Sequence, residues 1–346
     1  MPLYLDPDDL RDFRDRNQAP GALLDLVGAM AFRAAAAAQR LGVFQALRGR
    51  PRAAAQLSAV LGCSARQLAV LLDALVAFGY LERDGNAYAL GPAANPWLDR
   101  TAPGNFAAAL AVWDELLGSL WTGMEEAVRS GLPREPYYPW LEKRPETLRD
   151  FQSMLAGLAR LLAPAVVEAA PPLAGRLLDI GGGHAIYSLA FCSAAPEATA
   201  TVVDLPGALE EGRTRAEAAG LADRLTFVPG DLADPIDGRY DAVLLFNVCH
   251  GLDEQAGREL IARARGALGP GGIVLVLEPF ADAPARPHDT AFLRGFSLNL
   301  AITQGGRLYA FDEVAAWARE AGFARVERRA LAAPTTDELL VAWEDR

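Results

Sequence analysis

The chain has 346 residues, which leaves room for two domains, and 51% of them are apolar, enough for large cores. Its formal net charge of −11 argues against nucleic acid or an anionic membrane as a partner. No apolar run approaches the roughly 18 residues of a membrane span, and the N-terminus lacks the apolar core of a signal peptide.

The first 100 residues predict a unit of their own. Helical periodicity runs over residues 23–47, and residues 53–90 predict a helix, a glycine turn, a second helix and a hairpin that turns at Asp84-Gly85. This order is typical of a winged helix. A DNA-reading helix needs several basic or amide side chains, but residues 64–79 offer only Arg66 and Gln67, opposed by Asp73. We therefore expect no contact with nucleic acid.

Residues 101–170 predict a helical segment that is rich in aromatic side chains and is interrupted by a loop at 133–139. The ordinary role of most such side chains is packing, in a core or against a second subunit.

The most informative stretch follows, with an apolar run that ends in Asp179-Ile180 and leads into three glycines. It predicts a buried strand, a turn where backbone approaches a ligand closely, and a helix. A dinucleotide fingerprint needs a glycine where Ile186 stands, so the sequence disfavours a pyrophosphate ligand. Asp179 indicates a ligand with a positively charged amino group instead, and S-adenosylmethionine is such a ligand.

Four further strands are predicted in order, at residues 200–204, 224–231, 240–248 and 273–280. Helices are expected between them, around 207–220 and 253–268. This alternation predicts an α/β fold with a Rossmann-like, doubly wound, mostly parallel sheet. Asp204 ends the second strand, about 20 residues after the glycines, where a carboxylate can accept both hydroxyls of a ribose.

His250 follows the fourth predicted strand directly, at the carboxyl edge of the sheet where ligands bind in open α/β folds. An imidazole has an ordinary pKa of about 6.5 and suits a general base near neutral pH. The cysteines Cys63, Cys192 and Cys249 lie in apolar contexts without a C-x-x-C pair. They indicate reduced thiols in the cytoplasm and no zinc site.

With these motifs in order, the chain resembles the class I S-adenosylmethionine-dependent methyltransferases, from about residue 20 to the end. It is most similar to the small-molecule O-methyltransferases of the plant caffeate and acetylserotonin type and their bacterial relatives. The resemblance implies S-adenosyl-L-methionine as cofactor, S-adenosyl-L-homocysteine as product, no metal, and a homodimer. It also implies three parts: a winged-helix dimerisation domain (1–100), a helical linker to the substrate pocket (101–170) and the catalytic domain (171–346).

The resemblance also assigns site residues. His250 is the expected catalytic base and Glu278 the carboxylate that holds its ring. The expected cofactor-binding residues are Asp179, Gly181, Gly183, Asp204, Leu205, Asp231, Leu232 and Asn247. The expected walls of a pocket for an aromatic acceptor are Phe106, Trp113, Trp121, Met124, Phe292, Phe296, Asn299 and Thr303.

The chain departs from the family pattern at several positions. Gly251 and Leu252 follow the histidine in place of Asp or Asn and Trp, and Ala185 stands for the third glycine. Leu308 aligns with a second glutamate of the family, and His184 is a second, weaker candidate base. These departures leave open a C- or N-methyltransferase, a relative that runs a hydroxylation, decarboxylation or pericyclic reaction, and a ligand-sensing winged-helix regulator.

Overall fold

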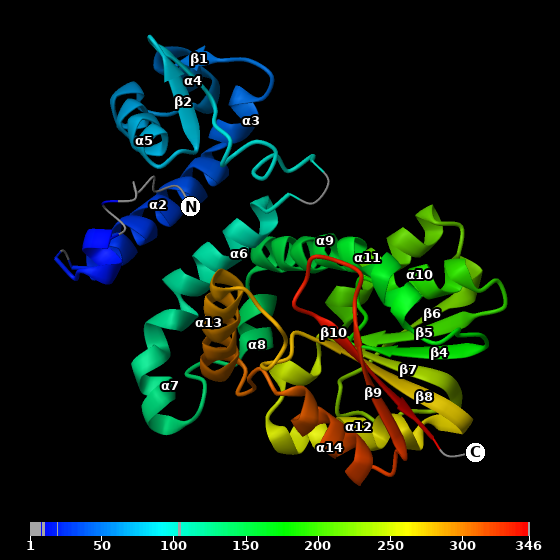
Figure 1. The fold of residues 1–346 in the computed structure, drawn as a ribbon. Coiled ribbons are helices and arrows are strands. Elements are labelled where there is room, and N and C mark those ends of the chain that lie inside the picture. The colour runs from blue at the N-terminus through cyan, green and yellow to red at the C-terminus, as the bar shows by residue number, and fades with distance from the viewer. Residues whose placement is uncertain (1–7, 9–10, 19, 103–104, 345–346) are drawn as a thin grey trace. The chain divides into compact units, whose positions relative to one another are not determined.

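The computed structural model describes residues 8, 11–18, 20–102 and 105–344. The chain divides into two compact units (Figure 1). The first comprises Met1–Gly118 with Pro145–Gly157, and the second comprises Ser119–Arg144 with Leu158–Arg346.

The first unit is helical with one small antiparallel sheet. Its elements are η1 (Arg11–Asp15), α2 (Ala22–Leu41), α3 (Val43–Leu47), β1 (Arg52–Ala53), α4 (Ala54–Leu61), α5 (Ala65–Ala77), β2 (Leu81–Asp84), β3 (Ala87–Leu90), α6 (Ala107–Gly118) and the start of α9 (Pro145–Ala169). The predicted winged helix is confirmed, with sheet order β1-β3-β2 and the hairpin turn at Gly85, whose φ is +56°. Leu57, Leu72 and Leu75 of α4 and α5 form its buried centre.

Helix α2 presents apolar side chains to solvent. Leu26 and Met30 are 56% and 57% exposed, and Leu23 is 45% exposed. Among the described helices, α2 alone is by itself long and apolar enough to cross a membrane, and the bent pair α4 and α5 would also pass that test if taken together. A search of the sequence for uninterrupted apolar runs misses the apolar character of α2, because Asp25, Arg33 and Arg40 interrupt this helix.

The second unit carries a seven-stranded sheet. Its strands are β4 (Arg176–Ile180), β5 (Thr199–Asp204), β6 (Leu225–Pro229), β7 (Tyr240–Phe246), β8 (Leu268–Glu278), β9 (Arg325–Ala330) and β10 (Glu338–Trp343). Its helices are η2 (Leu120–Gly123), α7 (Met124–Ser130), α8 (Tyr137–Glu142), the rest of α9, α10 (Ile186–Ala194), α11 (Pro206–Ala218), η3 (Ala222–Arg224), η4 (Cys249–Gly251), α12 (Glu254–Gly266), α13 (Pro287–Thr303) and α14 (Phe311–Glu320).

The order of the sheet is β6-β5-β4-β7-β8-β10-β9, with parallel pairing from β6 to β8. The chain runs outward from β4 to β6 and then returns to the other side of β4 as β7. This reversal is the switch point where open α/β sheets bind ligands, at the carboxyl ends of the strands. The predicted doubly wound α/β fold is confirmed.

Two apolar cores cover the two faces of this sheet, as Figure 1 shows by the helices above and below it. On one face, α9, α10 and α11 supply Val166, Phe191 and Leu209. On the other, α12 and α14 supply Ile261 and Trp317. Strands β7 and β8 are buried on both faces, which explains why their sequences are almost continuously apolar.

The sequence did not predict β9 and β10, which are antiparallel to their neighbours. Strand β10 lies between β8 and β9 and pairs Glu338 with Glu278. Strand β9 carries charged side chains on an edge and lacks a long apolar run. The edge strand β9 therefore gives a weak periodic signal, because its composition is charged and only one of its sides is paired.

Candidate functional site

The turn after β4 brings the backbone against two carboxylates. A Cβ atom added at Gly182 would lie 2.3 Å from Cγ of Asp179, and one at Gly183 would lie 2.7 Å from Oδ2 of Asp204. Gly181 has a φ of +76°, which favours glycine. The three glycines therefore allow a close approach that no larger residue permits.

Asp179 is buried at the end of β4. The hydroxyl of Ser188 donates a 2.7 Å hydrogen bond to its Oδ2 atom. The pKa of Asp179 is raised to about 7, mainly by burial. The charge of Asp204 acts in the same direction, and the hydrogen bond from Ser188 acts in the opposite one. A cationic ligand group would compensate this buried carboxylate, as the sequence indicated.

Asp204 is oriented by the backbone at the end of β5. The N–H of Gly183 donates to its Oδ2 atom at 2.8 Å, and the N–H of Leu205 donates to Oδ1 at 2.7 Å. The pKa of Asp204 is raised above its ordinary value, because burial outweighs these two backbone hydrogen bonds, which lower it. Each carboxylate oxygen keeps a further lone pair, which suits the two hydroxyls of a ribose.

Three more predicted cofactor residues lie on the same rim. Asp231 follows β6 and accepts a 2.9 Å hydrogen bond from the N–H of Ala233. Leu232 packs partly into the second core, and Asn247 follows β7 in the left-handed conformation, with a φ of +57°. Their roles remain predictions.

His250 and Glu278 meet at the ends of β7 and β8. Nδ1 of His250 forms a hydrogen bond with Oε2 of Glu278, and Oε1 of Glu278 accepts the backbone N–H of Cys249 at 2.8 Å. Burial lowers the pKa of His250, but the charge of Glu278 and its hydrogen bond outweigh burial and raise that pKa above its ordinary value. The pair stands beside the glycine turn, since a Cβ at Gly181 would lie 2.7 Å from Val248.

An aromatic and polar wall from η2 and α13 lies beside His250. The ring of Phe296 meets His250 edge-on at 5.3 Å and stacks on Phe292 at 6.2 Å. Nε1 of Trp121 donates a 2.8 Å hydrogen bond to Oδ1 of Asn299. The backbone carbonyl of Asn299 accepts a hydrogen bond from the hydroxyl of Thr303. Phe296 thus lies against the candidate base, and the other four predicted pocket residues lie on or against the same helix, α13.

Three other predicted pocket residues lie outside η2 and α13. Met124 is the first residue of α7, a helix that contacts α13. Phe106 and Trp113 belong to the first unit, immediately before α6 and within it. Their place in the acceptor pocket remains a prediction.

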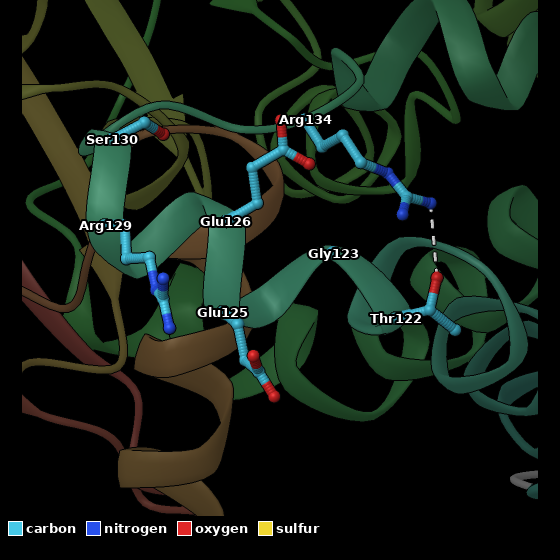
Figure 2. Close-up of a pocket in the computed structure, with 7 residues that line it drawn as sticks. All are labelled: Thr122, Gly123, Glu125, Glu126, Arg129, Ser130 and Arg134. Carbon is cyan, nitrogen blue, oxygen red and sulfur yellow. Dashed lines mark hydrogen bonds between the residues drawn. The ribbon is translucent and has the colours of Figure 1, made fainter.

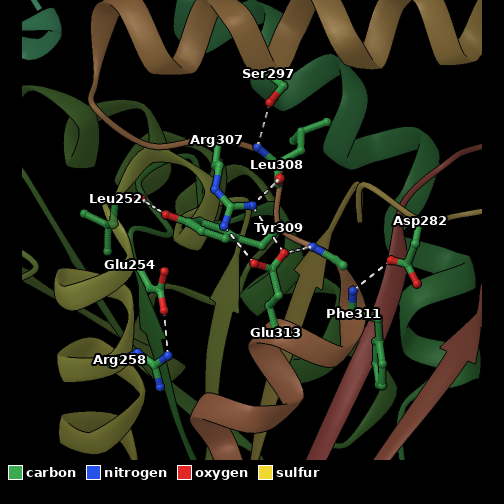
Figure 3. A network of polar contacts seen from close by, with 11 residues as sticks. Leu252, Glu254, Arg258, Asp282, Ser297, Arg307, Leu308, Tyr309, Phe311 and Glu313 are labelled. Carbon is green, nitrogen blue, oxygen red and sulfur yellow. Dashed lines mark hydrogen bonds and ion pairs between the residues drawn. The ribbon is translucent and has the colours of Figure 1, made fainter. Parts of the chain in front are cut away.

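Leu308, which we expected to align with a second glutamate of the family, is buried with Leu293 and Leu300 of α13. Polar contacts fix the loop around it (Figure 3). The N–H of Leu308 donates to Ser297, and the hydroxyl of Tyr309 donates to the carbonyl of Leu252 at 2.8 Å. Phe296 connects this apolar cluster to the ring of His250.

His184 has a different setting. Burial lowers its pKa to about 4, with the charges of Arg215 and Arg160 acting in the same direction. Its Nδ1 atom accepts the N–H of Ile186 at 3.2 Å, at the start of α10. A weakly basic, hydrogen-bonded ring is a poorer base than His250.

An open hollow of about 690 Å³ lies on the second unit, lined by residues of η2, α7 and the following loop (Figure 2). Its lining includes Glu125, Glu126, Arg129 and Arg134, and Arg134 donates to the hydroxyl of Thr122 at 3.2 Å. None of the predicted site residues lines it. This charged surface does not resemble the mostly apolar, enclosed site of a small aromatic ligand.

Three residues near the site were not predicted. Tyr138 of α8 interacts electrostatically with Asp204 and Asp231. Tyr187 of α10 and Asp337, before β10, interact with each other and are both buried. Within the described ranges, no cluster of three or more histidine, cysteine or acidic side chains could hold a metal ion.

Known protein families match most of the chain. An O-methyltransferase domain matches residues 125–324, and an O-methyltransferase dimerisation domain matches residues 25–100. The chain is 31% identical to the 3-hydroxy-5-methyl-1-naphthoate 3-O-methyltransferase of Streptomyces sahachiroi, over 86% of this chain and 87% of that protein. It is 31% identical to the tetracenomycin polyketide synthesis 8-O-methyl transferase TcmO of Streptomyces glaucescens, over 92% and 96%.

A solved structure agrees with the fold. The structure of PigF with SAH superposes with a TM-score of 0.84 at 26% identity, covering 94% of this chain and 99% of that one.

A substitution at Gly306 tests how closely its loop packs against the backbone of His250 and Gly251. A Cβ there would lie 2.2 Å from the carbonyl oxygen of His250 and 2.7 Å from the carbonyl carbon of Gly251, so backbone must move. We expect Gly306→Ala to lower the free energy of unfolding by about 1–3 kcal/mol in urea titrations. Gly266→Ala, where no atom lies within 4 Å, should be neutral or slightly stabilising. Equal stability of the two variants would contradict this packing.

Proposed function

Because this chain belongs to the family of S-adenosylmethionine-dependent O-methyltransferases, we propose that it methylates a hydroxyl of a small aromatic or polyketide-like metabolite, with His250 as general base. The observation that carries the proposal is the His250–Glu278 pair on the rim that also bears the glycine turn and Asp204. The relatives named above act on a naphthoate and in polyketide synthesis, which supports an aromatic acceptor.

The residues of the turn fit S-adenosylmethionine. Gly183 lets the turn lie against the carboxylate of Asp204, which presents two oriented oxygens to a ribose. Asp179 suits the amino group of the methionine part. When bound, the cofactor supplies an electrophilic methyl group on a sulfonium. The solved structure of PigF with SAH, which has the same fold, supports this cofactor.

The acceptor would lie against Phe292 and Phe296, two stacked rings that can cover a flat apolar molecule. Since Nδ1 of His250 is engaged with Glu278, Nε2 is the nitrogen that would take the acceptor proton. A phenol has a pKa near 10 and is rarely ionised at neutral pH, so a positioned base increases the fraction of phenolate. Glu278 stabilises the resulting imidazolium.

The alternatives are less well supported. A ligand-sensing regulator is not proposed, because both matched domains are those of an enzyme family. Transfer to carbon or nitrogen and the other reactions remain outcomes that product analysis by mass and proton spectra would distinguish. We retain the homodimer as part of the proposal, since residues 25–100 match a dimerisation domain.

Asp204→Ala tests the cofactor site. Loss of a charge-assisted hydrogen bond costs about 1.5–3 kcal/mol, so affinity for S-adenosylmethionine should fall roughly 10- to 150-fold in calorimetry. Glu217→Ala, an exposed acid of α11, should bind like the unaltered protein. Unchanged affinity in Asp204→Ala would refute the ribose assignment.

His250→Ala tests the base. Turnover should fall by about 10²- to 10⁴-fold while cofactor affinity stays nearly constant. Glu278→Gln should lose less, because it keeps the shape of the side chain, and His288→Ala, which is 68% exposed, should lose nothing. In the unaltered enzyme, turnover should fall as pH drops through the raised pKa of His250, since only the neutral ring accepts a proton. Full turnover in His250→Ala would exclude proton abstraction by this residue.

A substitution on the exposed apolar face of α2 tests whether this face forms the dimer interface. An interface of this kind is apolar and should persist on dilution to micromolar concentration and in high salt. Leu26→Glu would bury a charge there and should give monomers in sedimentation velocity, whereas Val228→Glu on the edge strand β6 should leave a dimer. A monomeric unaltered protein would contradict the proposal, and salt-sensitive binding to duplex DNA would revive a regulatory role.

A further inference from the structure

Asp337 is a buried acid that the mechanism above does not use. It is 8% exposed and lies immediately before β10. The hydroxyl of Thr335 donates to its Oδ2 atom at 2.5 Å, and the N–H of Asp337 donates back to that hydroxyl at 3.0 Å. The carboxylate is therefore held in one place.

The register of the sheet brings Asp337 to the rim that carries the candidate base. Strand β10 runs antiparallel to β8, and Glu338 pairs with Glu278. Asp337 is one residue earlier, beside the end of β8. Its carboxylate interacts electrostatically with both Glu278 and His250. The phenol of Tyr187, on α10, is a further neighbour.

Both oxygens of Glu278, the acid that contacts the ring of His250, are already engaged. Glu278 uses one oxygen for the backbone N–H of Cys249 and the other for the ring of His250. Leu308 supplies no carboxylate, and its surroundings are apolar. A buried imidazolium facing a single shared carboxylate is only partly compensated.

We propose that Asp337 is a positioning residue that supplies a second negative charge behind the His250–Glu278 pair and stabilises the protonated ring. The catalytic part of this inference rests on the proposed function. In that step the O–H bond of the acceptor breaks, an N–H bond forms at Nε2 of His250, and the new positive charge faces Glu278 and Asp337.

The electrostatics around both groups give the sign of the effect. Burial lowers the pKa of His250, while Glu278, by charge and hydrogen bond, and then Asp337 raise it. Burial raises the pKa of Asp337, and so does Glu278, whereas Thr335 and His250 lower it. Burial also raises the pKa of Tyr187, with Asp337 and Asp179 acting in the same direction. Removing the charge of Asp337 should therefore make His250 less basic.

The direct test is NMR titration of the imidazoles in the whole protein. The chain has three histidines, so the His250 signals can be assigned by comparison with His250→Gln. Asp337→Asn removes the charge and keeps the shape, and should lower the pKa of His250 by about one pH unit, a tenfold change in its protonation equilibrium. The matched control is Glu338→Gln, which removes a charge one residue along, from a carboxylate that pairs with Arg328, and should leave that pKa unchanged.

Two further variants keep the test decisive. Asp337→Ser is a smaller neutral replacement that should shift the pKa in the same direction if the asparagine variant folds poorly. Asp337→Glu keeps the charge, so the pKa of His250 in this variant should stay near that of the unaltered protein. An unshifted His250 in both neutral variants, or an equal shift in Glu338→Gln, would overturn the inference.

Kinetics then separate this inference from the proposed function. If His250 is the base, the acid limb of the turnover–pH profile should move to lower pH in Asp337→Asn, together with the NMR titration. A shifted titration with an unmoved kinetic limb supports the electrostatic role of Asp337 and contradicts the assignment of His250 as base.

Discussion

The site depends on one buried carboxylate. Glu278 is 3% exposed at the end of β8, and it connects that strand to the backbone after β7 through Cys249 and to the ring of His250. A buried charge is costly unless several donors satisfy it, so the two strand ends and the histidine are held together. The parallel pairing of β7 and β8 makes this possible, because their carboxyl ends reach the same rim.

Close backbone approach is the second requirement, and glycine meets it at two places. At Gly183 the missing side chain leaves room for the carboxylate of Asp204. At Gly306 it lets the loop before α14 lie against the carbonyl of His250. The same physical property thus acts at the glycine turn and at the loop before α14.

The basicity of His250 depends on two opposing effects, burial and nearby acids. Leu308 is buried with Leu293 and Leu300, and Phe296 packs against this cluster and against the ring of His250. An apolar environment penalises an imidazolium, yet the pKa of His250 is raised, because the charges of Glu278 and Asp337 outweigh burial. The nearby acids thus keep His250 basic although it is buried.

The sequence alone determined the α/β class, the winged helix, and the order in which Asp179, Asp204 and His250 reach one rim, because periodicity and glycine turns are local signals. It indicated Glu278 through spacing and resemblance. It could not find Tyr187 or Asp337, since neither belongs to a motif and β10 enters the sheet from the far end of the chain. Only the tertiary structure decided that Phe296 faces His250 and that Asp337 lies beside the end of β8, because such contacts follow from strand register and helix packing.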